Sequence, residues 1–307
     1  MKVKHILTEA ELTKRGDIGM VIDDGIILDA GQALVNIRMP DSVVEIEERV
    51  FKEHDVLQQV SFSKNLKKIG REAFYKCTNL QEVILPEGLV SIGPYAFRDC
   101  WRITKVQLPN TLTEIGDDAF RDCPRLTTIT IPDSVITIGS DVFSSCSRLE
   151  TVKFGRGLEE LPFYGFSNCK SLKEIDIPGN VITIDGGCFH RCEGLTSVTF
   201  HSGLKRLLPG VFAACKNLTK LELPDTLELI SDQAFLMCSA LTEVTFPASL
   251  QTIGEKVFSY SGIKTIYYQG TSTDWYKISK VPTWKSEIGR RREIEVVCTD
   301  TTLTYRA

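Results

Sequence analysis

The sequence lacks the features that would point to a membrane span, a nucleic-acid partner or a common enzyme active site. No run of about 18 apolar residues occurs, so no segment is predicted to cross a bilayer. The formal net charge of −4 gives no electrostatic reason to expect nucleic acid. Gly-x-x-x-x-Gly-Lys-Ser/Thr, His-Glu-x-x-His and Gly-x-Ser-x-Gly are absent, and no Gly-x-Gly-x-x-Gly follows a predicted strand. We therefore expect no catalytic residues and no cofactor.

Histidine is scarce, with four residues in the whole chain. The only local cluster of metal-ligand types is Cys188-Phe-His190-Arg-Cys192, followed by His201. Spacings of two residues do not place these side chains on one face, and both cysteines belong to the repeat described below, so no metal site is predicted. Lys285 and residues 290–292, all arginine, form a basic cluster without interleaved aromatic residues, which we interpret as a solvated surface.

What the sequence does contain is a long internal repeat. Phenylalanine recurs ten times at intervals of 23 residues without insertion or deletion, and in eight of these repeats a cysteine follows three residues later. A fixed period of this length indicates identical stacked coils, and repeat arrays grow without splitting their core. The ten phenylalanines are Phe51, Phe74, Phe97, Phe120, Phe143, Phe166, Phe189, Phe212, Phe235 and Phe258.

One repeat illustrates the structure expected of each coil. Leu80-x-x-Val83-x-Leu85 ends in an apolar–polar alternation that predicts a short strand with one buried face. Pro86 ends this strand. The spacing of Ala96, Phe97 and Cys100 suits one helical turn. The glycine that precedes this turn in several coils is replaced by other residue types elsewhere, so the turn does not require a positive φ there.

The eight column cysteines occupy one equivalent position per coil, from Cys77 to Cys238. Parallel Cβ vectors in stacked coils do not meet in disulfide geometry. We therefore expect reduced, buried thiols that act as small apolar side chains.

A longer period of 46 residues is superimposed on the first. Val44, Val90, Ile136 and Ile182 recur in alternate coils only. We interpret these as residues of a second short sheet, although a binding stripe is the alternative. The intervening coils carry Phe62, Phe154, Phe200 and Phe246.

The ends of the chain depart from the repeat, as the caps of a solenoid must. Thr8-Glu-Ala-Glu11 is a possible capping box, and residues 20–28 predict a hairpin with an Asp-Gly turn. Near the other end, residues 294–298 and 302–305 predict a closing hairpin. We divide the chain into an N-terminal cap (1–36), a repeat array (37–268) and a C-terminal cap (269–307).

The repeat resembles the leucine-rich repeats of the BspA-like, treponemal type, whose unit runs approximately I-P-x-S-V-x-x-I-G-x-x-A-F-x-x-C-x-x-L-x-x-V. Residues 131–152 match this unit almost throughout, and the similarity extends from about Ile37 to Tyr268. The resemblance implies an α/β fold: a right-handed leucine-rich-repeat solenoid with a curved parallel sheet of about ten coils. It also implies a non-enzymatic protein-interaction or adhesion module with a protein or glycan partner. A structural spacer or assembly unit without a dedicated binding face is the alternative.

In solenoids of this type the strand residues between buried positions face the concave surface. The expected binding residues are therefore exposed positions of six successive strands, rich in threonine and of mixed charge. They are Thr104, Lys105, Gln107, Thr127, Thr128, Thr130, Glu150, Thr151, Lys153, Lys173, Glu174, Asp176, Thr196, Ser197, Thr199, Thr219, Lys220 and Glu222. The same threonine usage also follows from β propensity alone.

The start of the chain predicts its location in the cell only weakly. Residues 1–10 contain too short an apolar stretch for a secretory signal and end next to acidic residues. We expect a cytoplasmic protein, or a chain from which a signal has been removed. A cell-surface or secreted location is what the resemblance implies.

Overall fold

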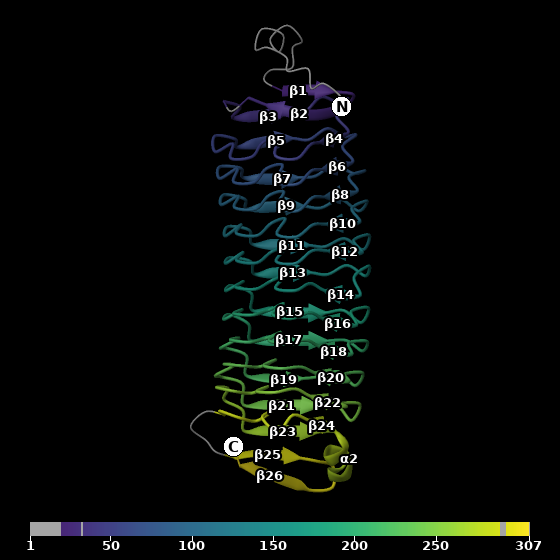
Figure 1. The fold of residues 1–307 in the computed structure, drawn as a ribbon, viewed down its shortest axis with the longest axis vertical. Helices are drawn as coiled ribbons and strands as arrows, with labels where there is room; N and C mark the ends of the chain where they lie inside the picture. Colours follow the sequence, from purple (N-terminus) through teal and green to yellow (C-terminus); the bar gives the residue numbers. More distant parts are fainter. Residues whose placement is uncertain (1–19, 32, 289–292, 307) are drawn as a thin grey trace.

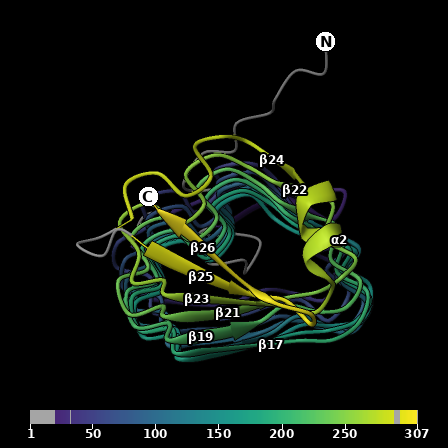
Figure 2. The same ribbon diagram turned by 90° about the horizontal axis from the view of Figure 1, so that it is seen from below.

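Each 23-residue repeat forms one coil with two short strands, and the coils stack into a column (Figure 1). The computed structural model describes residues 20–31, 33–288 and 293–306. We number the coils 1 to 10 by the phenylalanines from Phe51 to Phe258. Seen along the column axis, the first strands of the coils, which carry odd numbers, form one side, and the second strands, which carry even numbers, form another (Figure 2). The predicted solenoid is confirmed.

The odd-strand face consists of strands of three or four residues. They are β3 (Asn36–Arg38), β5 (Gln59–Ser61), β7 (Glu82–Ile84), β9 (Lys105–Gln107), β11 (Thr128–Thr130), β13 (Thr151–Lys153), β15 (Glu174–Ile177), β17 (Ser197–Phe200), β19 (Lys220–Glu222), β21 (Glu243–Phe246) and β23 (Thr265–Tyr268). These strands are parallel, and their hydrogen-bonded pairs β3–β5, β7–β9, β11–β13 and β15–β17 coincide with the 46-residue period.

The even-strand face consists of two-residue strands. They are β4 (Glu45–Ile46), β6 (Lys68–Ile69), β8 (Ser91–Ile92), β10 (Glu114–Ile115), β12 (Thr137–Ile138), β14 (Glu160–Leu161), β16 (Thr183–Ile184), β18 (Arg206–Leu207), β20 (Leu229–Ile230), β22 (Thr252–Ile253) and β24 (Ser279–Lys280). The structure has a second sheet, but Val44, Val90, Ile136 and Ile182 each lie one residue before a strand of it and not within the strand. The sheet is continuous on either side of one break, between β12 and β14.

The predicted helical turn at each phenylalanine is wrong. In coil 3 the segment consists of tight turns in which Ala96 N–H bonds to Gly93 O and Arg98 N–H to Tyr95 O. Tyr95 and Asp99 adopt left-handed φ values of 58° and 60°, and equivalent residues do so in the other coils. The glycine before the turn does not adopt a positive φ, as predicted. The only α-helix of the described ranges is α2 (Ser272–Lys277), beyond the array.

The core is an aromatic spine lined by thiols. The ten spine phenylalanines are fully buried and stack ring on ring, with centroids 4.9 to 6.1 Å apart. All ten cysteines are free and buried. Each column cysteine donates its thiol hydrogen to the carbonyl oxygen of the spine phenylalanine in the preceding coil, at Sγ–O distances of 3.0 to 3.4 Å. Each thiol therefore supplies a hydrogen bond to a buried carbonyl oxygen. Alanine at the same position would remove that hydrogen bond.

Both predicted hairpins are present at the ends of the array. β1 (Met20–Asp23) pairs with β2 (Ile26–Ala30), and β25 (Glu293–Val297) pairs with β26 (Thr302–Arg306). Trp275 and Trp284 cover the last coil, with ring centroids 6.3 Å from Phe246 and 6.5 Å from Phe258 respectively. The predicted capping box lies outside the described residues.

Candidate interaction surfaces

All eighteen residues proposed from the sequence are exposed on the odd-strand face. For twelve of them strand alternation explains this, because they flank an inward-pointing strand residue. The other six directly precede the strands: Thr104, Thr127, Glu150, Lys173, Thr196 and Thr219. In β11 the buried residue is Ile129, and Thr128 and Thr130 flank it. Parallel pairing aligns equivalent positions, so that Thr128 lies beside Thr151 and Glu174 beside Ser197.

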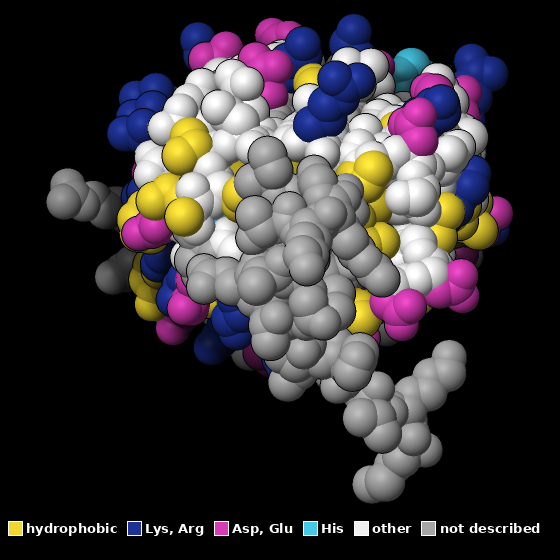
Figure 3. Space-filling model, turned by 90° about the horizontal axis from the view of Figure 1, so that it is seen from above, with side chains coloured by type: hydrophobic (Ala, Val, Ile, Leu, Met, Phe, Trp, Pro, Cys, Tyr) yellow, Lys and Arg dark blue, Asp and Glu magenta, His cyan; other side chains and the backbone are white. Residues whose placement is uncertain are grey.

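Several charged or polar side chains on this face are already paired with one another. Lys220 Nζ lies 2.7 Å from a carboxylate oxygen of Glu243, and His201 Nε2 lies 2.9 Å from Asp176 Oδ1. Side chains of both signs also alternate around the rim of the column at its N-terminal end (Figure 3). On the odd-strand face itself, the eighteen residues include four lysines and four carboxylates, so this face has no field of a single sign to attract a charged partner.

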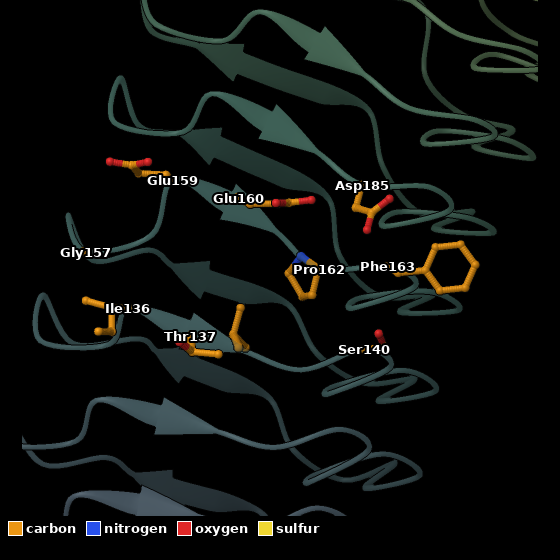
Figure 4. A pocket seen from close by; sticks show the side chains of 10 residues that line it. Ile136, Thr137, Ser140, Gly157, Glu159, Glu160, Pro162, Phe163 and Asp185 are labelled. Carbon is orange, nitrogen blue, oxygen red and sulfur yellow. The ribbon is translucent and has the colours of Figure 1, made fainter.

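A second surface, which the sequence did not indicate, lies on the even-strand face at the break between β12 and β14. It is an open pocket of about 580 Å³ (Figure 4). Ile136 and Glu159 lie at one end, Phe163 and Asp185 at the other, and Glu160 and Pro162 between them. The residues that line it are Ile136, Thr137, Ile138, Ser140, Gly157, Glu159, Glu160, Pro162, Phe163 and Asp185.

At the pocket, the backbone hydrogen bonds that join the even strands of neighbouring coils elsewhere are missing between coils 5 and 6. In each of the other nine coils the residue before the even strand donates its N–H to the preceding coil, as Ile136 does to Thr113 O; Glu159 N–H makes no such bond. In the same nine coils the residue after the strand also donates, as Gly139 does to Ile115 O. Coil 6 has Pro162 at that position, which has no N–H. The carbonyl oxygens of Ile136 and Ile138 consequently have no protein donor among the described residues.

The spine does not follow this opening. The rings of Phe143 and Phe166 are inclined by 18° with centroids 5.5 Å apart, and those of Phe235 and Phe258, where the even strands remain joined, by 17° at the same distance. On the odd-strand face the same two coils remain paired through β11 and β13. Coils 5 and 6 are therefore joined on one face and separated on the other.

The pocket has an acidic and an apolar component. In the described part of the chain, no lysine, arginine or histidine nitrogen comes within 4.0 Å of the carboxylates of Glu159, Glu160 or Asp185. Ile136 is 68% exposed and Phe163 45% exposed, unusual values for apolar side chains. The sequence signal for this pocket is that Leu161-Pro162-Phe163 differs from the repeat pattern. Such a difference alone does not distinguish a functional site from variation that the repeat tolerates.

The described residues contain no cluster of three His, Cys, Asp or Glu side chains arranged to hold a metal ion. Cys188 and Cys192 are buried in the core, whereas His201 is on the odd-strand face beside Asp176. Burial raises the pKa of Cys192 to about 12, so its thiol stays protonated. No described helix is both long enough and apolar enough to cross a bilayer.

Comparison with known families identifies the repeat. The model of the BspA type leucine rich repeat region matches residues 30–150 and 159–279 in six copies, and the chain belongs to this family. The unmatched residues 151–158 lead directly into the pocket. No curated protein gave a match.

Solved structures of bacterial leucine-rich repeat proteins have the same fold. A leucine-rich repeat protein of T. pallidum is 26% identical, with a TM-score of 0.52 over 66% of this chain and 88% of that one. The pneumococcal vaccine antigen PcpA is 23% identical, with a TM-score of 0.53 over 86% and 74%. A leucine-rich repeat protein of Bacteroides ovatus is 20% identical, with a TM-score of 0.50 over 89% and 94%.

Proposed function

We propose that the protein is a non-enzymatic interaction or adhesion module that presents its odd-strand face to a protein or glycan partner. Membership of a leucine-rich repeat family supports this function. The single observation that carries it is the exposure of all eighteen residues, which occupy equivalent positions on and just before the odd strands of six successive coils. Such a face offers a long array of hydroxyl, amide and charged groups for hydrogen bonding.

A structural spacer is the second candidate. It is favoured by the composition of the eighteen residues, which include no Trp, Tyr or Arg, the types that dominate binding energy at protein interfaces. Internal pairing such as Lys220–Glu243 also reduces the charge available to a partner.

The test replaces Thr128, Thr151, Glu174 and Ser197 together by arginine. Neighbouring coils place these residues in one row at spacings of roughly 5 Å, so any partner that covers the face must meet the new side chains. The control replaces Ser91, Glu114, Gln251 and Thr252 by arginine, which changes the total charge equally but alters the even-strand face.

We expect the wild type and the control to capture the same partner from a lysate or host-matrix extract, and the odd-face variant to lose it. Circular dichroism checks the fold of all three proteins. Equal capture by all three excludes the odd-strand face as the binding surface, and failure of the wild type to retain any specific partner favours the spacer.

A further inference from the structure

The polar groups of the even-strand pocket are mostly hydrogen-bond acceptors. The carbonyl oxygens of Ile136 and Ile138 have lost the N–H donors that stacking supplies elsewhere in the column. Three carboxylates add acceptor capacity and negative charge, and the lining residues include no basic side chain. Of the carboxylates, Asp185 has one oxygen occupied by Gly186 N–H at 2.6 Å. An occupant that satisfies this pocket must bring donors and positive charge.

The apolar groups define the shape of the occupant. Figure 4 shows a trough in which Glu160 extends toward Asp185, with the ring of Phe163 on the same side and Ile136 at the far end. The Phe163 ring is held by an edge-to-face contact with Tyr164, at a centroid distance of 4.5 Å. A planar cation can lie against such a ring while its N–H groups meet the carboxylates, and guanidinium combines both properties better than ammonium.

We propose that this pocket binds an arginine-bearing peptide segment of a partner protein. The guanidinium lies between Glu160 and Asp185 against the Phe163 ring, and an apolar neighbour in the peptide contacts Ile136. The backbone N–H groups of the peptide face the carbonyl oxygens of Ile136 and Ile138, which lack a donor from coil 6. The pocket is on a different face from the eighteen residues of the proposed function and uses none of them, so the two proposals fail independently.

The probe is the capped peptide Ala-Leu-Arg-Leu-Ala, titrated into protein labelled with ¹³C at the isoleucine methyl groups. We expect saturable shifts of the Ile136 methyl signal and none at Ile84, an exposed isoleucine of the odd-strand face. The same peptide with citrulline, which keeps the shape and loses the charge, should bind at least about tenfold more weakly, because a charge-assisted pair is lost. Lysine should bind more weakly than arginine.

Protein variants test the residues. Glu160→Gln combined with Asp185→Asn should weaken binding at least about tenfold, because both charged acceptors are lost. Glu114→Gln, an exposed change on β10 of the same face, should leave binding unchanged. Pro162→Gly restores the missing N–H donor and should weaken binding by allowing coil 6 to close on coil 5. Unchanged methyl signals of isoleucines elsewhere establish that each variant is folded.

Several results would overturn the proposal. They are the absence of a saturable shift at Ile136, equal binding of the citrulline or lysine peptide, and full binding by the double variant. If the folded Pro162→Gly variant binds the peptide as well as the wild type, the missing hydrogen bonds between coils 5 and 6 are not what keeps the pocket open for binding.

Discussion

Coils 4 and 6 have the same interior but different exteriors. Phe120 and Phe166 are equally buried, and each coil's column cysteine donates to the carbonyl of the preceding spine residue. Outside, Gly116 N–H bonds to Ile92 O at 2.8 Å, whereas Pro162 has no donor to offer. The phenylalanine stack therefore continues through coil 6 although the backbone hydrogen bonds between the even strands are missing there. Stacking at this point therefore does not require the even strands to pair, because the spine, the β11–β13 pair and the hydrogen bonds between the turns, such as Phe143 N–H to Gly165 O, remain.

The largest effect is expected where the interior itself is opened. Removing residues 270–307 uncovers Phe246 and Phe258, on which Trp275 and Trp284 pack, and leaves β23 without β25. An apolar end with an unpaired strand edge should make the truncated protein aggregate, unlike the local opening in coil 6. Size-exclusion chromatography checks this, with the exposed change Lys277→Ala as the control. A soluble monomer with unchanged melting would show that this segment is no cap.

Removing a spine ring should destabilise coils 4 and 6 equally. Phe120→Ala and Phe166→Ala should each lower the free energy of unfolding by ~3–5 kcal/mol, because both leave a cavity in a close-packed core. Lys153→Ala, on the exposed odd-strand face, should change it by less than ~0.5 kcal/mol. Urea denaturation measures all three. A much smaller cost for Phe166→Ala would mean that the opening in coil 6 has loosened its interior.

Removing a column thiol should also lower the free energy of unfolding, but by less than removing a spine ring. Cys146→Ala removes a 3.3 Å hydrogen bond to Phe120 O and a sulfur atom, and should cost ~1–2 kcal/mol. Burial raises the pKa of Cys146 to about 12, so a thiol-reactive dye should label few of the ten cysteines until denaturant is added. Rapid labelling of most of them in native buffer would contradict the buried column.

The regular features of this molecule can be predicted from the sequence because the period is fixed. Whether a repeat position is buried or exposed can then be judged from ten equivalent residues instead of one. The period predicts that Phe74 and Cys77 point into the core, and the structure confirms both. The helical turn was wrong because the spacing of Phe97 and Cys100 also fits two tight turns with left-handed residues. The thiol bond could not be predicted, since the repeat does not state which carbonyl group each thiol meets. The pocket was missed although Pro162, which has no N–H, stands where the other coils have a donor to the preceding coil.

The smallest expected effect distinguishes two carboxylates on the outside of the column. Glu72 accepts hydrogen bonds from Arg49, Lys52 and Arg71, which lower its pKa from 4.5 to about 2, whereas Glu160 has no basic partner within the described residues. A carboxylate whose pKa is lower in the folded state stabilises the fold above its unfolded pKa and loses that contribution as the pH falls toward its folded pKa.

Glu72→Gln should therefore lower the melting temperature at about pH 6 and have little effect near pH 2, because the wild type loses the ionised form between about pH 4.5 and 2. Glu160→Gln serves as the matched control and should melt like the wild type at about pH 6, since it breaks no ion pair. Thermal melts followed by circular dichroism give both comparisons. An equal deficit of Glu72→Gln at both pH values would mean that the glutamate acts through packing, and coils 2 and 6 would then not differ in electrostatics.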